Sequence, residues 1–557
     1  MKIHTATLLQ RNWSLLLLFA FLPCQVGIAQ ETHKLLAADG AASDYFGTSV
    51  AISEGVAIVG ADQEGANGFE SGSAYLFSAD TGGQLHKIFP TDGAPDDNFG
   101  WSVGIDEDIA IVGAPGKSSQ GPDTGAAYLF DVTTGTQLTR LYPTDSAANM
   151  SFGRSVAVSG TVAIVGAFSD DANGTNSGSA YLFSTTTGVQ LAKLTPTDGA
   201  AFDYFGNSVS ISGDTAVVGA FWDDDNGTSS GSAYLFDVPS GVQIAKLLPT
   251  DGAGQDYFGQ SVAISGNWVV IGAPWEDGNG FDSGSAYLFS VATGTQVAKL
   301  LATDGTTDDR FGWSVGISGN TAIVGAVLDD APASNSGSSY LFDISSGAQI
   351  ENLRPSDGAS WDGFGSSVAI SASQSISGAR HDDDNGSSSG SAYIFTNPTT
   401  DPGTPYCFGD GSAAACPCGN MGDSGAGCQN SSGAGATLCG SGSASVSADD
   451  LFLAMAPIPV NEFGLFFTGT GAIGPFPFGD GLRCVGGSVF RFPILNAGSA
   501  GTIGFGPVVG FSNSVFGPGG QISVGSTWNY QGWYRDPNGA CSSSFNLTNG
   551  MAITYGP

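Results

Sequence analysis

Positive charge is scarce in this sequence. Its 557 residues include 16 Lys and Arg against 51 Asp and Glu, which gives a formal net charge of −35. Nucleic-acid-binding proteins need a basic surface, so this composition excludes that class, and it also disfavours docking on anionic lipid. Only four histidines are present, which leaves little material for zinc sites or for histidine-based catalysis. We recognise no catalytic constellation, although the many paired acids leave open an enzyme that acts on polysaccharide.

Long hydrophobic runs are also missing, except near the N-terminus. The apolar run from Ser14 to Leu22 follows Lys2 and Arg11, and it is far shorter than the ~20 residues of a membrane-spanning helix. Small residues at the −3 and −1 positions end this segment at Ala29. The layout predicts a signal peptide over residues 1–29, cleaved near Ala29, and hence a secreted or cell-surface protein with no transmembrane segment.

A period of 53 residues runs through the sequence after this segment. A Phe-Gly pair recurs seven times at that interval, and so does a Gly-Ala pair. The pairs begin at Phe46, Phe99, Phe152, Phe205, Phe258, Phe311 and Phe364, and at Gly60, Gly113, Gly166, Gly219, Gly272, Gly325 and Gly378. Seven copies without insertion or deletion indicate seven equivalent structural units.

Each unit has the pattern of four short strands, which we name A to D. In the fourth copy they are residues 207–212, 215–220, 232–237 and 242–248, separated by turn residues. Four strands per ~50 residues are typical of a β-propeller blade. The seventh copy ends without a D strand, whereas an extra one begins at Thr32. The sequence therefore predicts an all-β protein with a seven-bladed propeller over residues 30–396, in which the N-terminal strand closes the last blade.

The units resemble FG-GAP repeats, which build the propeller of integrin α subunits and occur in many secreted bacterial proteins. Phe205-Gly206 and Gly219-Ala220 carry the motif, and Gly272-Ala273-Pro274 matches its second half in full. The resemblance implies a propeller that serves adhesion, ligand binding or scaffolding. The calcium loop of integrin-type repeats, DxDxDGxxD, is absent here, because the interval between the two pairs is too short; Asp106-Glu107-Asp108 does not supply it.

Acidic residues gather in two of the four kinds of loop. Antiparallel strands place the D–A and B–C loops on one face of the ring and the A–B and C–D loops on the other. Of 44 acids in residues 31–404, the D–A and B–C loops hold 32, whereas the region has 11 basic residues. We expect a strong negative potential on this face, which we call the D–A/B–C face.

The clustered acids of the B–C loops are candidate metal ligands. Asp and Asn also cap turns by bonding their own backbone, so a purely structural role is the alternative, and a cationic partner is a third. Oxygen-rich loops suit calcium, although the spacing matches no EF-hand pattern. The candidate residues are Asp170, Asp171, Asn173, Asp223, Asp224, Asp225, Asn226, Glu276, Asp277, Asp382, Asp383 and Asp384.

These features predict a binding or adhesion protein that uses its D–A/B–C face. The predicted ligand is an extracellular protein, a glycan or a divalent cation. Trp222 and Trp275 precede two of the acidic clusters, where they either stack on sugars or pack against the next blade. The alternatives are an extracellular structural component and, less favoured, an enzyme that acts on polysaccharide.

A separate domain is expected beyond a Pro- and Thr-rich linker at residues 397–405. Residues 406–557 hold seven of the eight cysteines, and in an exported protein these indicate disulfides. They are Cys407, Cys416, Cys418, Cys428, Cys439, Cys484 and Cys541. Because seven is odd, one thiol is expected to be free or to pair between chains.

The rest of this segment predicts a small antiparallel β-sandwich. Strand-like runs lie at residues 451–456, 464–468, 489–495 and 528–534. The sequences around Tyr406–Asp410, Cys416–Asn420, Phe478–Cys484 and Trp533–Pro537 resemble a C-terminal module of secreted bacterial proteins. The resemblance implies an attachment or export appendage and no particular activity.

Overall fold

The computed structural model describes residues 29–556 except 119, 398–402, 413, 423–424, 442–443, 447–448, 450, 540 and 542. The predicted signal peptide lies outside the described residues apart from Ala29. The chain divides into two compact units, residues 28–398 and the segment from residue 399 onward, and the division falls inside the predicted linker. Among the described residues, no helix has the length and apolar character needed to cross a membrane.

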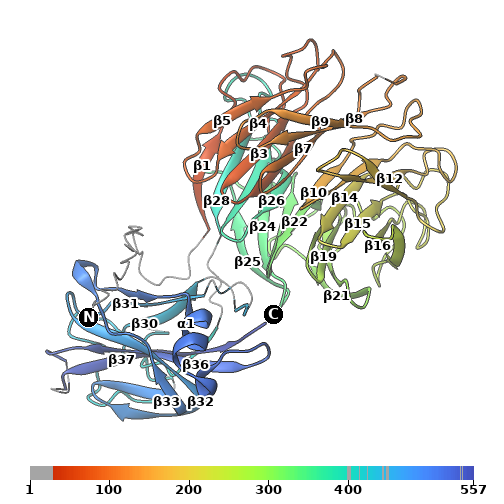
Figure 1. Ribbon diagram of the computed structural model, residues 1–557. Helices are drawn as coiled ribbons and strands as arrows, with labels where there is room; N and C mark the ends of the chain where they lie inside the picture. Colours follow the sequence, from red (N-terminus) through yellow and green to blue (C-terminus); the bar gives the residue numbers. More distant parts are fainter. Residues whose placement is uncertain are drawn as a thin grey trace, which may run out of the picture. The chain divides into compact units, whose positions relative to one another are not determined.

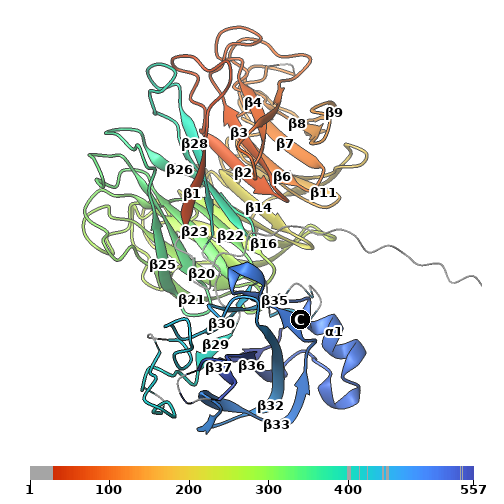
Figure 2. The same ribbon diagram turned by 90° about the vertical axis from the view of Figure 1, so that its left-hand side faces the viewer.

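The first unit consists of seven four-stranded antiparallel sheets (Figures 1 and 2). The A strands are β2 (Ser49–Ser53), β6 (Ser102–Asp106), β10 (Val156–Ser159), β14 (Ser208–Ser212), β18 (Ser261–Ser265), β22 (Phe311–Ser318) and β26 (Phe364–Ile370). The B strands are β3 (Val56–Ala61), β7 (Ile109–Ala114), β11 (Val162–Ala167), β15 (Thr215–Ala220), β19 (Trp268–Ala273), β23 (Thr321–Ala326) and β27 (Gln374–Ala379).

The C and D strands complete the sheets in the same order. The C strands are β4 (Ser73–Ser78), β8 (Ala126–Asp131), β12 (Ser179–Ser184), β16 (Ser232–Asp237), β20 (Ser285–Ser290), β24 (Ser338–Asp343) and β28 (Ser391–Thr396). The D strands are β5 (Gln84–Ile88), β9 (Gln137–Leu141), β13 (Gln190–Leu194), β17 (Val242–Leu247), β21 (Thr295–Leu300), β25 (Ala348–Leu353) and, in the seventh blade, β1 (Gln30–Leu35).

The ring closes as predicted. β1 pairs antiparallel with β28, and the seventh sheet has the order β1-β28-β27-β26. Successive A strands contact one another around the whole ring, including β26 with β2, so they line its centre. Because the first and last strands of the unit share one sheet, the outer strand of the seventh blade is supplied without an exposed edge at β28.

The hydrophobic core lies between neighbouring sheets. Phe258 of the fifth blade is fully buried against Tyr287 and Phe289 of the same blade, with ring centroids 5.5 and 5.8 Å away, and the same cluster includes Val217 and Leu235 of the fourth blade. The other half of the motif provides close approach between blades. A Cβ atom added at Gly219 of the fourth blade would lie 2.1 Å from the carbonyl oxygen of Gly259 in the next. Only glycine lets the two backbones meet at this distance.

The C-terminal unit has two antiparallel sheets, as a β-sandwich requires. One contains β29 (Thr404–Tyr406), β37 (Phe545–Thr554), β36 (Thr527–Arg535), β32 (Phe463–Phe478), β33 (Gly481–Arg491) and β34 (Leu495–Asn496). The other contains β30 (Thr437–Ser441), β31 (Phe452–Ala456) and β35 (Ile503–Phe505). The short helix η1 (Gly498–Ala500) precedes β35, and α1 (Val508–Val515) and η2 (Pro518–Gly520) follow it. The runs at 451–456 and 528–534 match β31 and β36, whereas the run at 489–495 is wrong in extent, because β33 ends at Arg491.

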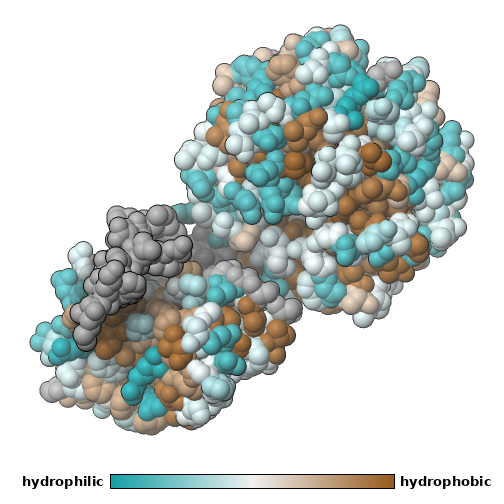
Figure 3. Space-filling view, viewed as in Figure 1, coloured by the Kyte–Doolittle hydropathy of each residue, from teal (hydrophilic) through white to brown (hydrophobic). Residues whose placement is uncertain are grey.

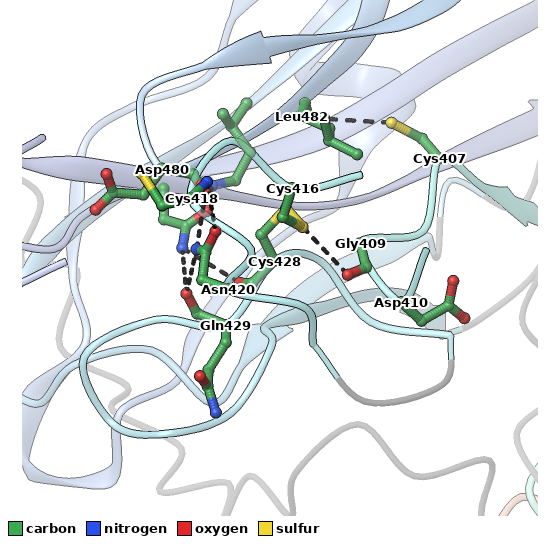
Figure 4. Close-up of a disulfide and its surroundings, with 12 residues drawn as sticks. Cys407, Gly409, Asp410, Cys416, Cys418, Asn420, Cys428, Gln429, Asp480 and Leu482 are labelled. Atoms are coloured by element: carbon green, nitrogen blue, oxygen red, sulfur yellow. Dashed lines mark hydrogen bonds between the residues drawn. A yellow bond between two sulfur atoms is a disulfide. The ribbon is translucent and has the colours of Figure 1, made fainter. Parts of the chain in front are cut away.

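Three disulfides hold the described Cys-rich segment: one joins it to β33, one lies within it, and one joins it to the loop between β36 and β37. The pairs are Cys407–Cys484, Cys416–Cys428 and Cys418–Cys541, and Figure 4 shows the second close to Asn420, whose side chain donates to the carbonyl oxygens of Gln429 and Asp480. Cys439 lies elsewhere, on β30, where it packs against the larger core of this unit. None of the described cysteines is free, so the expected free thiol is wrong for this part of the chain.

Candidate functional site

The D–A and B–C loops of a blade meet around one lysine of its D strand. In the fourth blade the Lys246 Nζ atom lies 2.8 Å from a carboxylate oxygen of Asp198, in the D–A loop. It also lies 2.9 and 2.6 Å from oxygens of Asp223 and Asp225, in the B–C loop. The buried Tyr234 hydroxyl donates to Asp223 over 2.8 Å. These contacts place both acidic loops on one face, as strand alternation predicted.

The electrostatics of this arrangement follow from its burial. Burial alone would lower the pKa of Lys246, but hydrogen bonds to Asp198, Asp225 and Asp223 raise it above its usual value. Burial would raise the pKa of Asp198, but the hydrogen bond and charge of Lys246 hold it below its usual range. The lysine is thus charged at any physiological pH and fixes the geometry of both loops.

The same lysine-centred arrangement recurs in other blades. The corresponding ion pairs are Lys34–Asp357 and Lys34–Asp382, Lys87–Asp39 and Lys87–Glu64, Lys193–Asp145 and Lys193–Asp170, and Lys299–Asp251 and Lys299–Glu276.

Two blades replace the lysine in different ways. In the second blade Arg140 pairs with Asp92, while Lys117 stands where other blades have the first B–C acid and pairs with Asp97 at 2.8 Å. In the sixth blade the amide of Asn352 donates to Asp304, and Arg354 pairs with the same carboxylate. Each change keeps a positive or hydrogen-bonding group on the D–A aspartate.

The predicted metal ligands have three kinds of partner in the structure. Asp170, Asp223, Glu276 and Asp382 are lysine partners, and so are Asp225 and Asp384. Asp171, Asp224, Asp277 and Asp383 each accept a hydrogen bond from the backbone N–H five residues later. Asn173 donates to the carbonyl oxygen of Pro196, and the backbone N–H of Asn226 donates to Ser230.

These contacts bear on calcium. No group of three or more His, Cys, Asp or Glu side chains in the described part of the chain is arranged to hold a metal ion. The oxygens that converge in the fourth blade converge on an ammonium group, so the donor set does not fit a resident divalent cation while Lys246 is in place. Calcium at these loops stays a prediction that requires displacement of a lysine.

A second aspartate of the D–A loops is buried. Asp203, Asp256, Asp309 and Asp362 each accept a backbone N–H three residues earlier in the chain. Burial raises the pKa of each to about 6, despite that hydrogen bond. These side chains stabilise the loop turns, and they are partly protonated just below neutral pH.

Exposed aromatic side chains gather on the same face. Among the propeller residues that the structure describes, every large aromatic side chain with high exposure lies in a D–A or B–C loop; they are Phe69, Phe89, Tyr142, Phe202, Trp222, Phe281 and Trp361. Three of these, Phe69, Phe281 and Trp361, are 72%, 66% and 65% exposed. In the view of Figure 3, hydrophobic residues of the propeller surface lie among hydrophilic ones.

The two tryptophans singled out in the sequence take part in packing. The ring of Trp275 packs at a tilt against Tyr257, with centroids 4.7 Å apart, and its centroid lies 5.6 Å from that of Trp313 in the next blade. Trp222 contacts Tyr204 edge-on at 5.1 Å and remains 39% exposed. The expected packing against the next blade is therefore present for Trp275, and Trp222 also keeps a surface for a ligand.

The lysine partners were missed at the level of sequence. The signal was available, because Lys34, Lys87, Lys193, Lys246 and Lys299 recur with the repeat period. A basic residue that recurs in step with two acidic loops predicts an ion pair in every blade.

Comparison with known proteins gives one match. A sequence model described as FG-GAP repeat matches residues 30–77, 83–130, 136–183, 189–236, 242–289, 295–342 and 348–395. Each segment begins at a D strand and ends in the C strand of the following blade. No curated protein sequence matches the chain significantly.

Proposed function

Because the chain belongs to the FG-GAP repeat family, with seven matched segments between residues 30 and 395, we propose that it is an extracellular binding or adhesion protein. Its D–A/B–C face holds the ligand, an extracellular protein or glycan. The disulfides seen among the described residues of the C-terminal unit agree with an oxidising, extracellular location.

The exposed aromatic side chains carry this proposal. Exposed apolar side chains within a polar surface are typical of interaction sites, and aromatic residues are enriched at interfaces. The opposite face, formed by A–B and C–D loops, has no large exposed aromatic side chain among the described residues. The lysine-centred pairs hold the aromatic-bearing loops in place, which limits the ordering that binding would otherwise require.

The test compares two triple variants of the full chain on an array of extracellular glycans and matrix proteins. Phe69→Ser, Phe281→Ser and Trp361→Ser together remove aromatics of the D–A/B–C face. Leu85→Ser, Leu138→Ser and Val242→Ser together remove apolar side chains of 46%, 49% and 61% exposure on D strands. We expect the first variant to lose at least about tenfold in affinity for the best ligand and the second to bind like the parent.

Other outcomes would contradict the proposal. An equal loss of affinity in both triple variants would show that the ligand does not bind at the D–A/B–C face. Assembly of the chain into large particles without any array ligand would favour a structural component, and release of sugar fragments from a glycan would favour an enzyme.

A further inference from the structure

In the part of the chain that the structure describes, two arginines at the centre of the ring form no ion pair. Of the 11 basic residues in the propeller, nine form ion pairs in the described structure. The two others are Arg154 and Arg380, and the Nε of Arg154 is buried without any hydrogen-bond acceptor. In a chain with 51 acidic residues, two unpaired guanidinium groups need a reason.

Their positions place both at one end of the ring's centre. Arg154 follows Phe152-Gly153 and precedes strand A of the third blade, whereas Arg380 follows strand B of the seventh. A and B run antiparallel, so the start of A and the end of B lie at the same end. That is the end from which the D–A and B–C loops emerge, and the A strands surround the centre.

The residue type at these two positions varies from blade to blade. Other positions do not vary: at the position of Tyr234, for example, all seven blades have tyrosine. By contrast, the positions equivalent to Arg154 hold Thr48, Trp101, Asn207, Gln260, Trp313 and Ser366, and those equivalent to Arg380 hold Asp62, Pro115, Phe168, Phe221, Pro274 and Val327. A ring of equivalent positions with unlike side chains forms one asymmetric site rather than seven equal ones.

Aromatic side chains surround Arg154 and continue from blade to blade on this face. The Arg154 guanidinium lies 4.6 Å from the Trp101 ring centroid and 5.2 Å from that of Phe168. From Phe168, ring contacts of 4.7 to 6.1 Å continue in sequence. We call this series the aromatic arc; its members are Trp101, Phe168, Tyr204, Phe221, Tyr257, Trp275 and Trp313.

The charges at the centre do not balance. Burial, together with the positive charge of Arg380, lowers the pKa of Arg154 to about 10. Asp62, whose charge is felt by Arg154 and which itself feels the charge of Arg380, is buried with one carboxylate oxygen unpartnered, and burial raises its pKa to about 6. The Nε of Arg380 donates to His381 over 3.2 Å; burial, with the charge of Arg380, lowers the pKa of this histidine, so it stays neutral at neutral pH and does not change the balance.

We propose that Arg154 and Arg380 bind the carboxylate of an acidic saccharide at the centre of the D–A/B–C face, with the sugar ring against the aromatic arc. A guanidinium group binds a carboxylate through paired N–H donors. The apolar C–H face of a sugar ring matches an aromatic ring in shape and polarity. The inference rests on the proposed function and names the ligand class and its place on that face.

The surrounding charge limits the ligand to few anionic groups. The D–A and B–C loops hold 32 acids, which would repel a polyanion on approach. A single uronic acid, or one at the end of a neutral chain, meets the two arginines without that cost.

The test is isothermal titration of the full chain with glucuronate and galacturonate, with methyl glucoside and acetate as probes that each lack one half of the ligand. We expect a uronate to bind at least about tenfold more tightly than either partial probe. Arg154→Gln and Arg380→Gln should each weaken uronate binding by at least about tenfold. The matched control is Arg354→Gln, since this arginine is already paired with Asp304.

The outcomes separate this inference from the proposed function. No uronate binding up to about 10 mM, or equal binding by both arginine variants and the control, overturns the inference alone if the aromatic face variants still lose their array ligand. Acetate binding as tight as uronate binding would mean an adventitious ion only and would also overturn it. Unchanged melting temperatures of the arginine variants will show that lost binding is not lost folding.

Discussion

Lys246 lies among the carboxylates of Asp198, Asp223 and Asp225. The pair that it forms with Asp223 is largely buried. The side chains of Asp223 and Lys246 are 5% and 15% exposed, whereas isolated surface pairs contribute little to stability. Removing one partner of a buried pair leaves an uncompensated charge, which costs far more than the pair itself contributes.

Lys246→Met should therefore lower the free energy of unfolding by about 2–3 kcal/mol, a value below that for a fully buried pair because Asp198 and Asp225 are half exposed. Urea unfolding followed by tryptophan fluorescence measures the loss. Lys246→Arg keeps the charge and should lose less than half as much. Equal stability of the Met variant and the parent would show that the lysine does not hold the loops.

The effect of calcium on the melting temperature tests whether Lys246 keeps metal ions out of these loops. With Lys246 in place we expect millimolar calcium, compared with EDTA at matched ionic strength, to leave the melting temperature unchanged. Lys246→Ala frees the oxygens of three carboxylates, so calcium should raise the melting temperature of that variant. A clear rise in the parent chain would instead mean that calcium displaces the lysines.

Some residues of the D–A/B–C face could be predicted from the sequence, and others could not. The acids of the D–A and B–C loops could be predicted because they repeat, and the repeat also fixes which loops share a face. Arg154, Arg380 and Asp62 were missed for the opposite reason, since each occurs in a single blade. Positions that vary within an otherwise regular repeat were the available signal.

At the scale of loops and strands, the D–A loops couple stability to pH. Asp203, Asp256, Asp309 and Asp362 have a folded-state pKa of about 6 against an unfolded value of 3.8. Burial also raises the pKa of Asp62 to about 6. Because the folded state binds these protons first, stability rises as pH falls through about 6 toward 3.8.

The lysine partners act in the opposite direction at lower pH. The pKa values of Asp39, Asp145, Asp198, Asp251 and Asp357 are lowered by their lysines against the effect of burial. Their contribution is present above 3.8 and is lost as pH falls through the folded-state values. His381, with a lowered pKa, opposes the gain slightly below pH 6.5.

We therefore predict that the melting temperature of the propeller rises from pH 7.5 to about pH 5 and falls again below about pH 3.5. Scanning calorimetry across this range measures it. Changing Asp203, Asp256, Asp309 and Asp362 together to Asn should flatten the rise, because the amide oxygen still accepts the backbone N–H without titrating. A profile that the four changes leave intact would contradict this assignment.

The two units should respond differently to reduction. Residues 30–396 contain no cysteine, whereas two disulfides of the C-terminal unit close loops of 77 and 123 residues. Loss of such a disulfide costs about 2–5 kcal/mol. A reductant should therefore shift the calorimetric transition of the C-terminal unit to lower temperature and leave that of the propeller in place. A shift of both transitions, or of neither, would contradict the prediction.

The strands of the two units were not equally predictable. Alternation and turn residues repeated seven times predict every propeller strand to within a few residues, because errors in one copy are corrected by the others. The C-terminal unit has no repeat. There the long β32–β33 hairpin, β37 and α1 were not predicted, since their register depends on tertiary pairing and on disulfides that join distant segments.

For the whole molecule, the clustered charges and the proposed binding surface lie on the same face of the propeller. All 11 basic residues of the repeat region lie on or near the D–A/B–C face, where nine of them neutralise acids. The face therefore combines a rigid, ion-paired rim, exposed aromatic side chains and an unpaired pair of arginines at its centre. That combination favours recognition of a specific ligand over general attraction of cations.

Hydrogen–deuterium exchange of the full chain, with and without its best array ligand, tests this claim most directly. The account predicts slower exchange in the D–A and B–C loops of several blades, with no change in the A–B and C–D turns. Protection confined to the A–B and C–D turns or to the C-terminal unit would contradict the account, because the ligand would then lie away from the D–A/B–C face.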